Sequence, residues 1–139
     1  MKSIADTDVY VRFCETDSGG HVNNASYFFY FEEARTRFFN SILEREDQIN
    51  FIIARAECDY VAQAFAAQTL TVKSSITHIG TKSFTIVHEI YEKSSQKLIA
   101  KARAVIVCFD FRQQKSVPIS DKLRAELAQY INVDSVQEV

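Results

Sequence analysis

Residues 25–43 constrain the fold more than any other part of the chain. Apolar residues recur there with helical spacing along one stripe, at Tyr27, Phe31, Ala34, Phe38 and Ile42. More large apolar side chains project from other sides of the same helix, at Phe28, Phe29, Tyr30, Phe39 and Leu43. A helix that is apolar on nearly all sides is a buried helix. The rest of the chain therefore has to wrap around it.

The segments after this helix are suited to wrapping it. Four long stretches are rich in Val, Ile, Thr and aromatic residues, as strands are: 51–65, 69–79, 83–93 and 97–111. The connections between them are short, which favours antiparallel neighbours. Before the helix, residues 8–13 alternate in polarity, with Val9, Val11 and Phe13 on one face, and predict a half-buried strand.

This order predicts an α+β fold in which one long central helix is wrapped by a curved five-stranded antiparallel sheet. Pro118 ends the sheet region, and residues 119–131 have the spacing of a short amphipathic helix. No repeat, linker or low-complexity stretch interrupts the chain, so we expect one domain over residues 1–139, with a frayed tail over 133–139. Long strands leave exposed edges, and pairing across a dimer is a common way to cover them.

Charge and hydropathy exclude several classes of protein. The net charge of −2 provides no basic surface for nucleic acid or anionic lipid. No apolar stretch reaches the roughly 18 residues of a membrane-spanning helix, and the first residues lack the apolar core of a signal peptide. We therefore expect a cytoplasmic protein with neither nucleic-acid nor membrane partners.

The spacing of the cysteines and of two of the histidines does not match that of metal ligands. Cys14, Cys58 and Cys108 are odd in number and widely spaced, which fits neither a disulfide framework nor a zinc site. Each lies in an apolar run, so we expect small buried thiols in strands. His78 and His88 lie in predicted strands without metal-ligand spacing, and a structural role is expected for both. We expect no metal and no cofactor.

Two of the three glycines stand side by side, in a segment that carries a family resemblance. Residues 16–24 (TDSGGHVNN), followed by Tyr27 and residues 31–35 (FEEAR), resemble the signature of hotdog-fold acyl-CoA thioesterases, closest to the 4-hydroxybenzoyl-CoA thioesterase and YbgC-like groups. The resemblance extends over almost the whole chain through residues 56–60, 78–84 and 102–105. It implies a hotdog fold, hydrolysis of a CoA thioester, and a homodimer or homotetramer with the pocket at a subunit interface.

The resemblance also implies roles for residues of this loop. Asp17 aligns with the catalytic aspartate, which acts as a nucleophile through a mixed anhydride or as a general base on water. The backbone N–H of Asn24 aligns with the amide that polarises the carbonyl. The glycine pair, Gly20 included, would let the thioester carbonyl approach the positive end of the helix. On residue type alone, Asp17 could instead be a turn or capping carboxylate.

Other residues around the loop have less specific roles. His21 could assist the leaving thiol or the attacking water, or it could only pack the loop. Asn23 and Asn24 are good helix-capping residues. Glu32 and Glu33 are adjacent on a helix and cannot converge on one site. Either is a reserve candidate, since another hotdog branch uses a helix glutamate, and salt bridges to Arg35 or Arg37 are the alternative.

The phosphates of CoA require cations. The resemblance favours Lys82 with Ser83, and solvent-exposed charge is the alternative for each cation considered. Arg55, Lys101 and Arg103 are weaker candidates. Residues 63–68 depart from the family pattern, which in many relatives has a proline-containing turn there, so the turn at this place is left open.

Two other functions remain as alternatives to hydrolysis. A non-catalytic acyl-CoA-binding module would keep the pocket but lose the acid, whereas Asp17 is present. A hotdog hydratase or dehydratase would use a histidine in a proline-rich loop, but the only proline, Pro118, is far from His21 in the sequence. The acyl group, and the choice between CoA and a carrier-protein thioester, cannot be read from one sequence.

Overall fold

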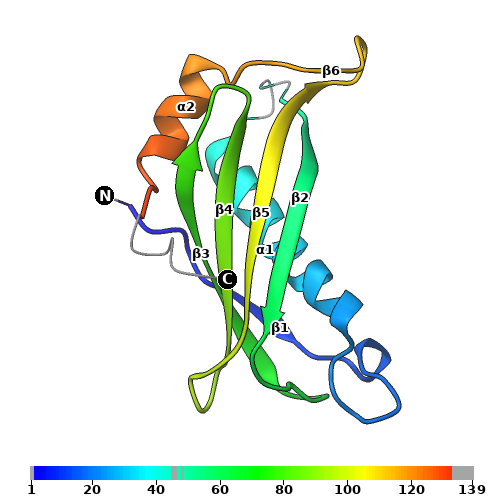
Figure 1. Ribbon diagram of the computed structural model, residues 1–139. Helices are drawn as coiled ribbons and strands as arrows, with labels where there is room; N and C mark the ends of the chain where they lie inside the picture. The colour runs from blue at the N-terminus through cyan, green and yellow to red at the C-terminus, as the bar shows by residue number, and fades with distance from the viewer. Residues whose placement is uncertain (1, 45–46, 48, 133–139) are drawn as a thin grey trace.

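The computed structural model describes residues 2–44, 47 and 49–132, so the expected tail at 133–139 lies outside the described residues. Figure 1 shows the order of the elements along the chain. The two α-helices are α1 (Asn24–Ile42) and α2 (Asp121–Ala128), and a short 3-10 helix, η1 (Phe13–Glu15), precedes α1. The strands are β1 (Thr7–Tyr10), β2 (Phe51–Tyr60), β3 (Thr69–Ile79), β4 (Ser83–Glu92), β5 (Lys97–Asp110) and β6 (Lys115–Ser116).

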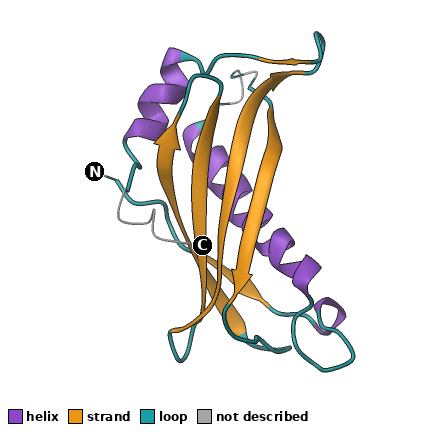
Figure 2. Cartoon of the chain, in the orientation of Figure 1, coloured by secondary structure: helices purple, strands orange, loops and turns teal. Residues whose placement is uncertain are grey.

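The sheet has the order β1-β3-β4-β5-β2, and every pairing in it is antiparallel. The two-residue β6 pairs only with β5, off this path. Figure 2 shows α1 running across one face of the curved sheet. The predicted α+β architecture, with five main strands around one long helix, is confirmed. Strand β2 lies at one edge, so one side of its backbone has no strand partner within the described chain.

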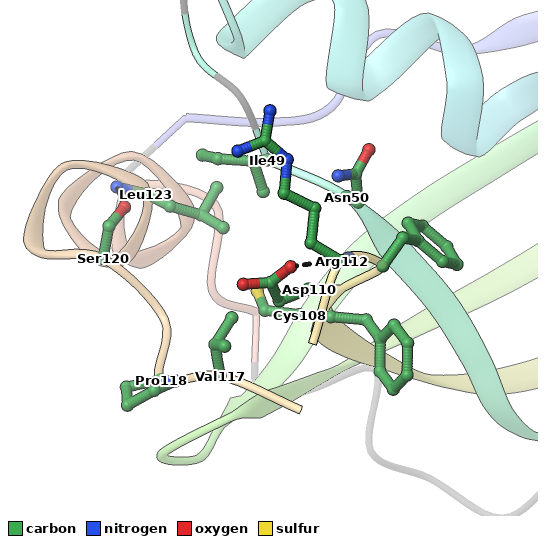
Figure 3. A pocket seen from close by; sticks show the side chains of 11 residues that line it. Ile49, Asn50, Cys108, Asp110, Arg112, Val117, Pro118, Ser120 and Leu123 are labelled. Atoms are coloured by element: carbon green, nitrogen blue, oxygen red, sulfur yellow. Dashed lines mark hydrogen bonds between the residues drawn. The ribbon is translucent and has the colours of Figure 1, made fainter. Parts of the chain in front are cut away.

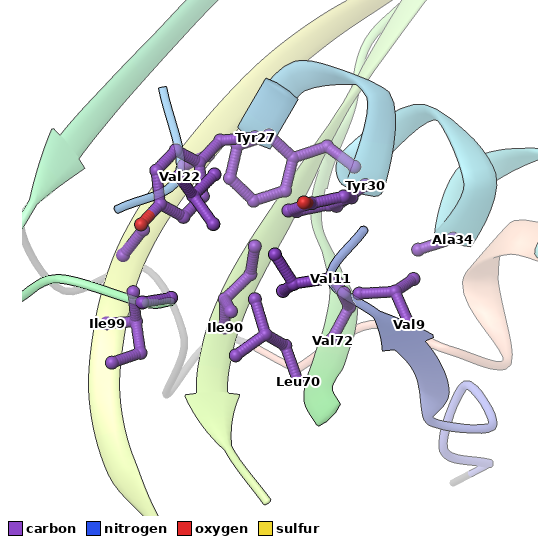
Figure 4. Packing of buried hydrophobic residues seen from close by; sticks show 14 residues of the cluster. Val9, Val11, Val22, Tyr27, Tyr30, Ala34, Leu70, Val72, Ile90 and Ile99 are labelled. Carbon is purple, nitrogen blue, oxygen red and sulfur yellow. The ribbon is translucent and has the colours of Figure 1, made fainter. Parts of the chain in front are cut away.

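The core fills the space between α1 and the sheet. The five residues of the predicted helical stripe are all buried, with at most 7% of their surface exposed. At the start of α1, Figure 4 shows Tyr27 and Tyr30 packed with Val11, Leu70 and Ile90. A second cluster continues toward α2 and contains Phe38, Ile76, Phe84, Ile106, Leu123 and Leu127. The helix is not buried on every side, however, because Phe29 is 67% exposed.

The first predicted strand ends earlier than its alternation suggested. β1 stops at Tyr10, and Phe13, expected on the buried face, is 83% exposed. The reason is a local set of hydrogen bonds. The carboxylate of Glu15 accepts from the Arg12 backbone N–H at 2.9 Å and from the Arg12 guanidinium at 2.8 Å, which favours the 3-10 turn. Cys14 lies in this turn and is exposed, so the prediction of three buried strand thiols was wrong; Cys58 is partly buried and Cys108 is buried.

Strand β2 also ends early, at Tyr60 rather than at residue 65. The N–H groups of Val61 and Ala62 both donate to the Ile99 carbonyl, so the regular ladder stops there. The helix predicted over 119–131 is confined to Asp121–Ala128, and the Ser120 side chain caps it by accepting the Leu123 N–H. None of the described helices is long and apolar enough to cross a bilayer.

A polar cluster is buried between α1 and the sheet. His88 on β4 is fully buried, with its ring stacked on Phe31 at a centroid distance of 5.3 Å. Its Nδ1 lies 2.7 Å from the Ser74 hydroxyl, and its Nε2 lies 3.4 Å from Nη1 of Arg35. Since arginine can only donate, Nε2 is the unprotonated nitrogen. Burial, followed by the Arg35 charge, lowers the pKa of His88 to about 3.

Candidate active site

Asp17 lies in a tight loop between η1 and α1. Thr16 and Val22 form an isolated antiparallel bridge that closes the loop. Within it, the Asp17 N–H donates to the His21 carbonyl at 3.0 Å, and the Gly20 N–H donates to the Asp17 carbonyl at 2.9 Å. Gly20 has φ of 85°, a conformation that favours glycine. One glycine of the pair is therefore required by the turn itself.

The carboxylate of Asp17 accepts a hydrogen bond at one oxygen and lies beside the His21 ring at the other. Oδ1 accepts the Gly19 N–H at 2.9 Å, and Oδ2 lies 3.4 Å from Nδ1 of His21. The side chain of Asp17 is 41% exposed, and that of His21 is 35% exposed. The carboxylate is thus oriented by the loop yet accessible to water and to a ligand.

The amino end of α1 follows this loop directly. The Asn23 side chain caps the helix by accepting the Ser26 N–H at 2.9 Å. Asn24 begins the helix, and its backbone N–H has no acceptor among the described residues, as is usual for the first turn. That N–H and the positive end of the helix dipole can stabilise an oxyanion. A carboxylate and a helix amino end therefore belong to the same short segment.

Contacts from distant parts of the chain hold this segment in place. The Val22 N–H donates to the Ala64 carbonyl at 2.8 Å, and His21 forms an isolated bridge with Phe65. From the end of β2, the Tyr60 hydroxyl donates to the Asn24 carbonyl at 3.2 Å. Sequence reasoning missed these supporting residues, although it had marked residues 63–68 as the place where the family pattern changes.

A second set of contacts, made by Glu15, connects the loop to the first turns of α1. The Glu15 carbonyl accepts from the Asn23 N–H and from the Ser26 hydroxyl. Its carboxylate also accepts the Tyr30 hydroxyl at 2.9 Å. Burial alone would raise the pKa of Glu15, but the hydrogen bonds from Arg12 and Tyr30 outweigh it and lower the pKa. This ionised carboxylate has its partners already, so it is a supporting group and not a free base.

The predicted CoA-binding residues lie elsewhere in the chain. Lys82 and Ser83 stand at the β3–β4 turn, at the opposite end of the sheet from the Asp17 loop (Figure 1). The Lys82 carbonyl accepts the Cys108 N–H at 2.9 Å, and the Lys82 side chain is exposed. Within one chain, the structure therefore brings Asp17, Gly20, His21 and Asn24 together but does not bring Lys82 and Ser83 to them.

The weaker candidate cations are already engaged with carboxylates of the sheet. Arg55 and Arg103 lie 3.8 Å and 3.5 Å from Glu57, and Lys101 lies 4.0 Å from Glu89. On α1, Glu33 pairs with Arg37 at 3.2 Å, and Glu32 is exposed. Arg35 is buried against His88.

A cavity of about 420 Å³ lies at the same end of the sheet as Lys82. Figure 3 shows Cys108, Val117 and Leu123 lining it, with Asp110 from the end of β5 and Arg112 from the turn that follows. It does not include Asp17. In the part of the chain that the structure describes, no group of three or more His, Cys, Asp or Glu residues is placed to hold a metal ion.

Comparison with known proteins agrees with the fold. The family model of the thioesterase-like superfamily matches residues 11–127. The long-chain acyl-CoA thioesterase FadM of Escherichia coli is 29% identical over 90% of this chain and 98% of its own. A predicted thioesterase from Bacillus stearothermophilus has a similar structure, with a TM-score of 0.82 and 34% identity over 91% of this chain and 96% of the other. A Thermus thermophilus thioesterase complexed with coenzyme A and Zn also has a TM-score of 0.82, with 27% identity over 91% of this chain and 93% of the other.

The hotdog architecture and the family match over most of the chain lead to one conclusion. This chain belongs to the thioesterase-like superfamily and is a hotdog-fold thioester hydrolase.

Proposed function

We propose that this protein hydrolyses an acyl-CoA thioester to a free acid and CoA, with Asp17 as the catalytic carboxylate. The observation that carries the proposal is the loop in which an oriented, accessible carboxylate immediately precedes the free amino end of a helix. The similarity to the long-chain acyl-CoA thioesterase FadM supports the choice of substrate class. The free thiols of Cys14, Cys58 and Cys108 suit a reducing compartment, so we place the activity in the cytoplasm.

The chemistry follows from the two ends of this loop. The thioester carbonyl oxygen accepts the Asn24 N–H, which stabilises the negative charge that develops on that oxygen. Asp17 then acts in one of two ways: it takes a proton from the attacking water, or it attacks the carbonyl carbon and forms a mixed anhydride that water cleaves. In both routes the C–S bond breaks, CoA leaves as a thiolate, and one water molecule is consumed. Gly20 keeps the backbone at the reacting carbonyl free of a side chain.

The separation of Lys82 from Asp17 supports a site shared by two chains. β2 is an edge strand of ten residues with Ile53 and Tyr60 each 46% exposed, which suits pairing with a second copy. Antiparallel pairing of two β2 strands about a two-fold axis brings the Phe51 end of one chain beside the Tyr60 end of the other. The Lys82 end of one chain then approaches the Asp17 loop of its partner. The protein therefore acts as a homodimer, or as a tetramer built from two such dimers.

A hybrid dimer tests this arrangement. Lys82→Ala is expected to raise KM for acyl-CoA, increasingly so at low salt, while kcat changes little, because the ammonium contacts the carrier and not the reacting carbon. A dimer of one Lys82→Ala chain and one Asp17→Asn chain retains one intact site. At substrate concentrations well below KM, its rate is expected to be about half that of the wild type.

Two differently tagged chains, purified together and assayed for thiol release, provide this measurement. Lys97→Ala, at the exposed first residue of β5, is the matched control and is expected to leave KM unchanged. A hybrid no faster than the average of its two parents would show that Lys82 and Asp17 do not share a site across chains. A stable particle of 15.9 kDa in light scattering, the mass of one chain, would contradict the proposed dimer.

A panel of CoA esters tests the proposed activity. The panel spans short, long and aromatic acyl groups, and a thiol-detecting reagent reports free CoA. We expect release of CoA from at least one class at a rate proportional to enzyme concentration. Binding without release from any ester would favour a non-catalytic acyl-CoA-binding module. Addition of water to an enoyl-CoA without thiol release would favour the hydratase.

A further inference from the structure

Gly19 is not explained by the backbone of the turn. Unlike Gly20, it does not have the positive φ that favours glycine. Its surroundings nevertheless leave little room for a side chain. A Cβ at position 19 would lie 3.0 Å from Nε2 of His21, 3.2 Å from Cδ2 of the same ring and 3.3 Å from Oδ1 of Asp17. The missing side chain therefore makes room for the imidazole of His21 and the carboxylate of Asp17.

The imidazole of His21 occupies that room in a defined position. The backbone of His21 is fixed on both sides, because its carbonyl accepts the Asp17 N–H at 3.0 Å and the residue bridges to Phe65. Its Nδ1 faces Oδ2 of Asp17 at 3.4 Å, while Oδ1 of the same carboxylate accepts the Gly19 N–H. One oxygen of Asp17 thus accepts a hydrogen bond, and the other lies beside a ring nitrogen of His21.

We propose that His21 is a positioning residue for Asp17 and that Gly19 is part of the same arrangement. The inference rests on the proposed function, since it assigns how the catalytic carboxylate is oriented. A carboxylate held at Oδ1 alone can turn about that hydrogen bond. When protonated, Nδ1 of His21 can donate to Oδ2, 3.4 Å away, and so set the plane of the carboxylate relative to the helix amino end. A reacting group displaced by about 1 Å can lose on the order of 10² in rate, so orientation at this place has a measurable effect.

Four variants test the proposal. His21→Ala is expected to lower kcat by about 10- to 100-fold with KM unchanged, because the binding of the carrier is not affected. His21→Asn is expected to recover most of that loss, since its amide N–H can take the place of Nδ1–H. Gly19→Ala is expected to lower kcat in the same direction as His21→Ala but less, because its methyl group shifts the ring while both functional groups remain. Ser18→Ala, exposed in the same loop, is the matched control and is expected to leave kcat unchanged.

The outcomes separate this inference from the proposed function. Wild-type kcat in both His21→Ala and Gly19→Ala would overturn the positioning role while leaving Asp17 as the catalytic group. The same holds if His21→Asn is as impaired as His21→Ala, since the ring would then serve only loop packing. In an Asp17→Asn background, measured by single turnover, adding His21→Ala is expected to have no further effect. Full activity of Asp17→Asn itself would instead contradict the proposed function.

Discussion

Replacement of Asp17 by asparagine is expected to lower kcat by a factor of about 10² to 10⁴, the usual scale for loss of a general acid–base group. Asparagine keeps the shape of the side chain, and its Oδ1 can still accept the Gly19 N–H that orients the native carboxylate. The variant should therefore fold and bind CoA ester as the wild type does. What it lacks is the negative charge and the basicity that both routes through Asp17 require. Steady-state thiol release, with KM and kcat separated, measures the effect.

The two helix glutamates provide the control for this result. Glu33→Gln loses only an exposed ion pair with Arg37, and Glu32 is exposed on the same helix. Both glutamine variants are expected to retain most of the rate. If Asp17→Asn is active and one of the glutamate variants is not, catalysis depends on α1 and the assignment of Asp17 is wrong.

Acidification is expected to destabilise the folded protein strongly between pH 6.5 and 3, through His88. Full burial lowers the pKa of this histidine from 6.5 to about 3 in the folded state. Above pH 6.5 the ring is neutral in both the folded and the unfolded state. It therefore adds no pH dependence to the free energy of unfolding in that range. Below pH 6.5 the unfolded chain binds a proton that the folded chain does not. The free energy of unfolding therefore falls by up to about 1.4 kcal/mol per pH unit, or roughly 5 kcal/mol over the whole window.

Denaturant melts of two histidine variants measure this contribution. His88→Gln keeps a polar side chain beside Ser74 and Arg35 but does not titrate, so its stability should depend much less on pH between 6 and 4.5. Carboxylates with lowered pKa, such as Glu15, act at lower pH and do not obscure this range. His78→Gln, at an exposed position on β3, is the matched control and should keep the wild-type slope. Equal slopes in His88→Gln and the wild type would contradict the account of His88.

The fold was predictable where local pattern and burial agree. The stripe from Tyr27 to Ile42 is buried as its spacing predicts, and the limits of β3 match the sequence pattern to the residue. The ends of β1 and β2 could not be predicted from the alternation of polar and apolar residues, because local hydrogen bonds determine where these strands end. The Glu15 carboxylate accepts the Arg12 N–H and favours a turn after β1. The Ile99 carbonyl accepts the N–H groups of Val61 and Ala62, just beyond β2.

Only those parts of the candidate site whose residues are close in sequence could be predicted. Asp17, Gly20 and Asn24 lie within one segment, so their proximity follows from the chain itself. The support from Tyr60 and Ala64 depends on where β2 ends, which no periodicity records. The reason for the glycine pair was only half anticipated. Gly20 serves the turn, whereas Gly19 leaves space for a ring two residues later.

The fate of the thioester in ¹⁸O-labelled water tests the central claim most directly. Enzyme in excess is mixed with an acyl-CoA from the reactive class, and mass spectrometry follows the acid, the CoA and the peptide that contains Asp17. Hydrolysis predicts one CoA per ester consumed and one ¹⁸O atom per ester, in the acid or in the Asp17 carboxylate, with label in Asp17 identifying the anhydride route. The Asp17→Asn protein is expected to return the ester unchanged on the same timescale. Ester that binds the wild-type protein but is recovered intact, or that Asp17→Asn cleaves as quickly, would contradict the account.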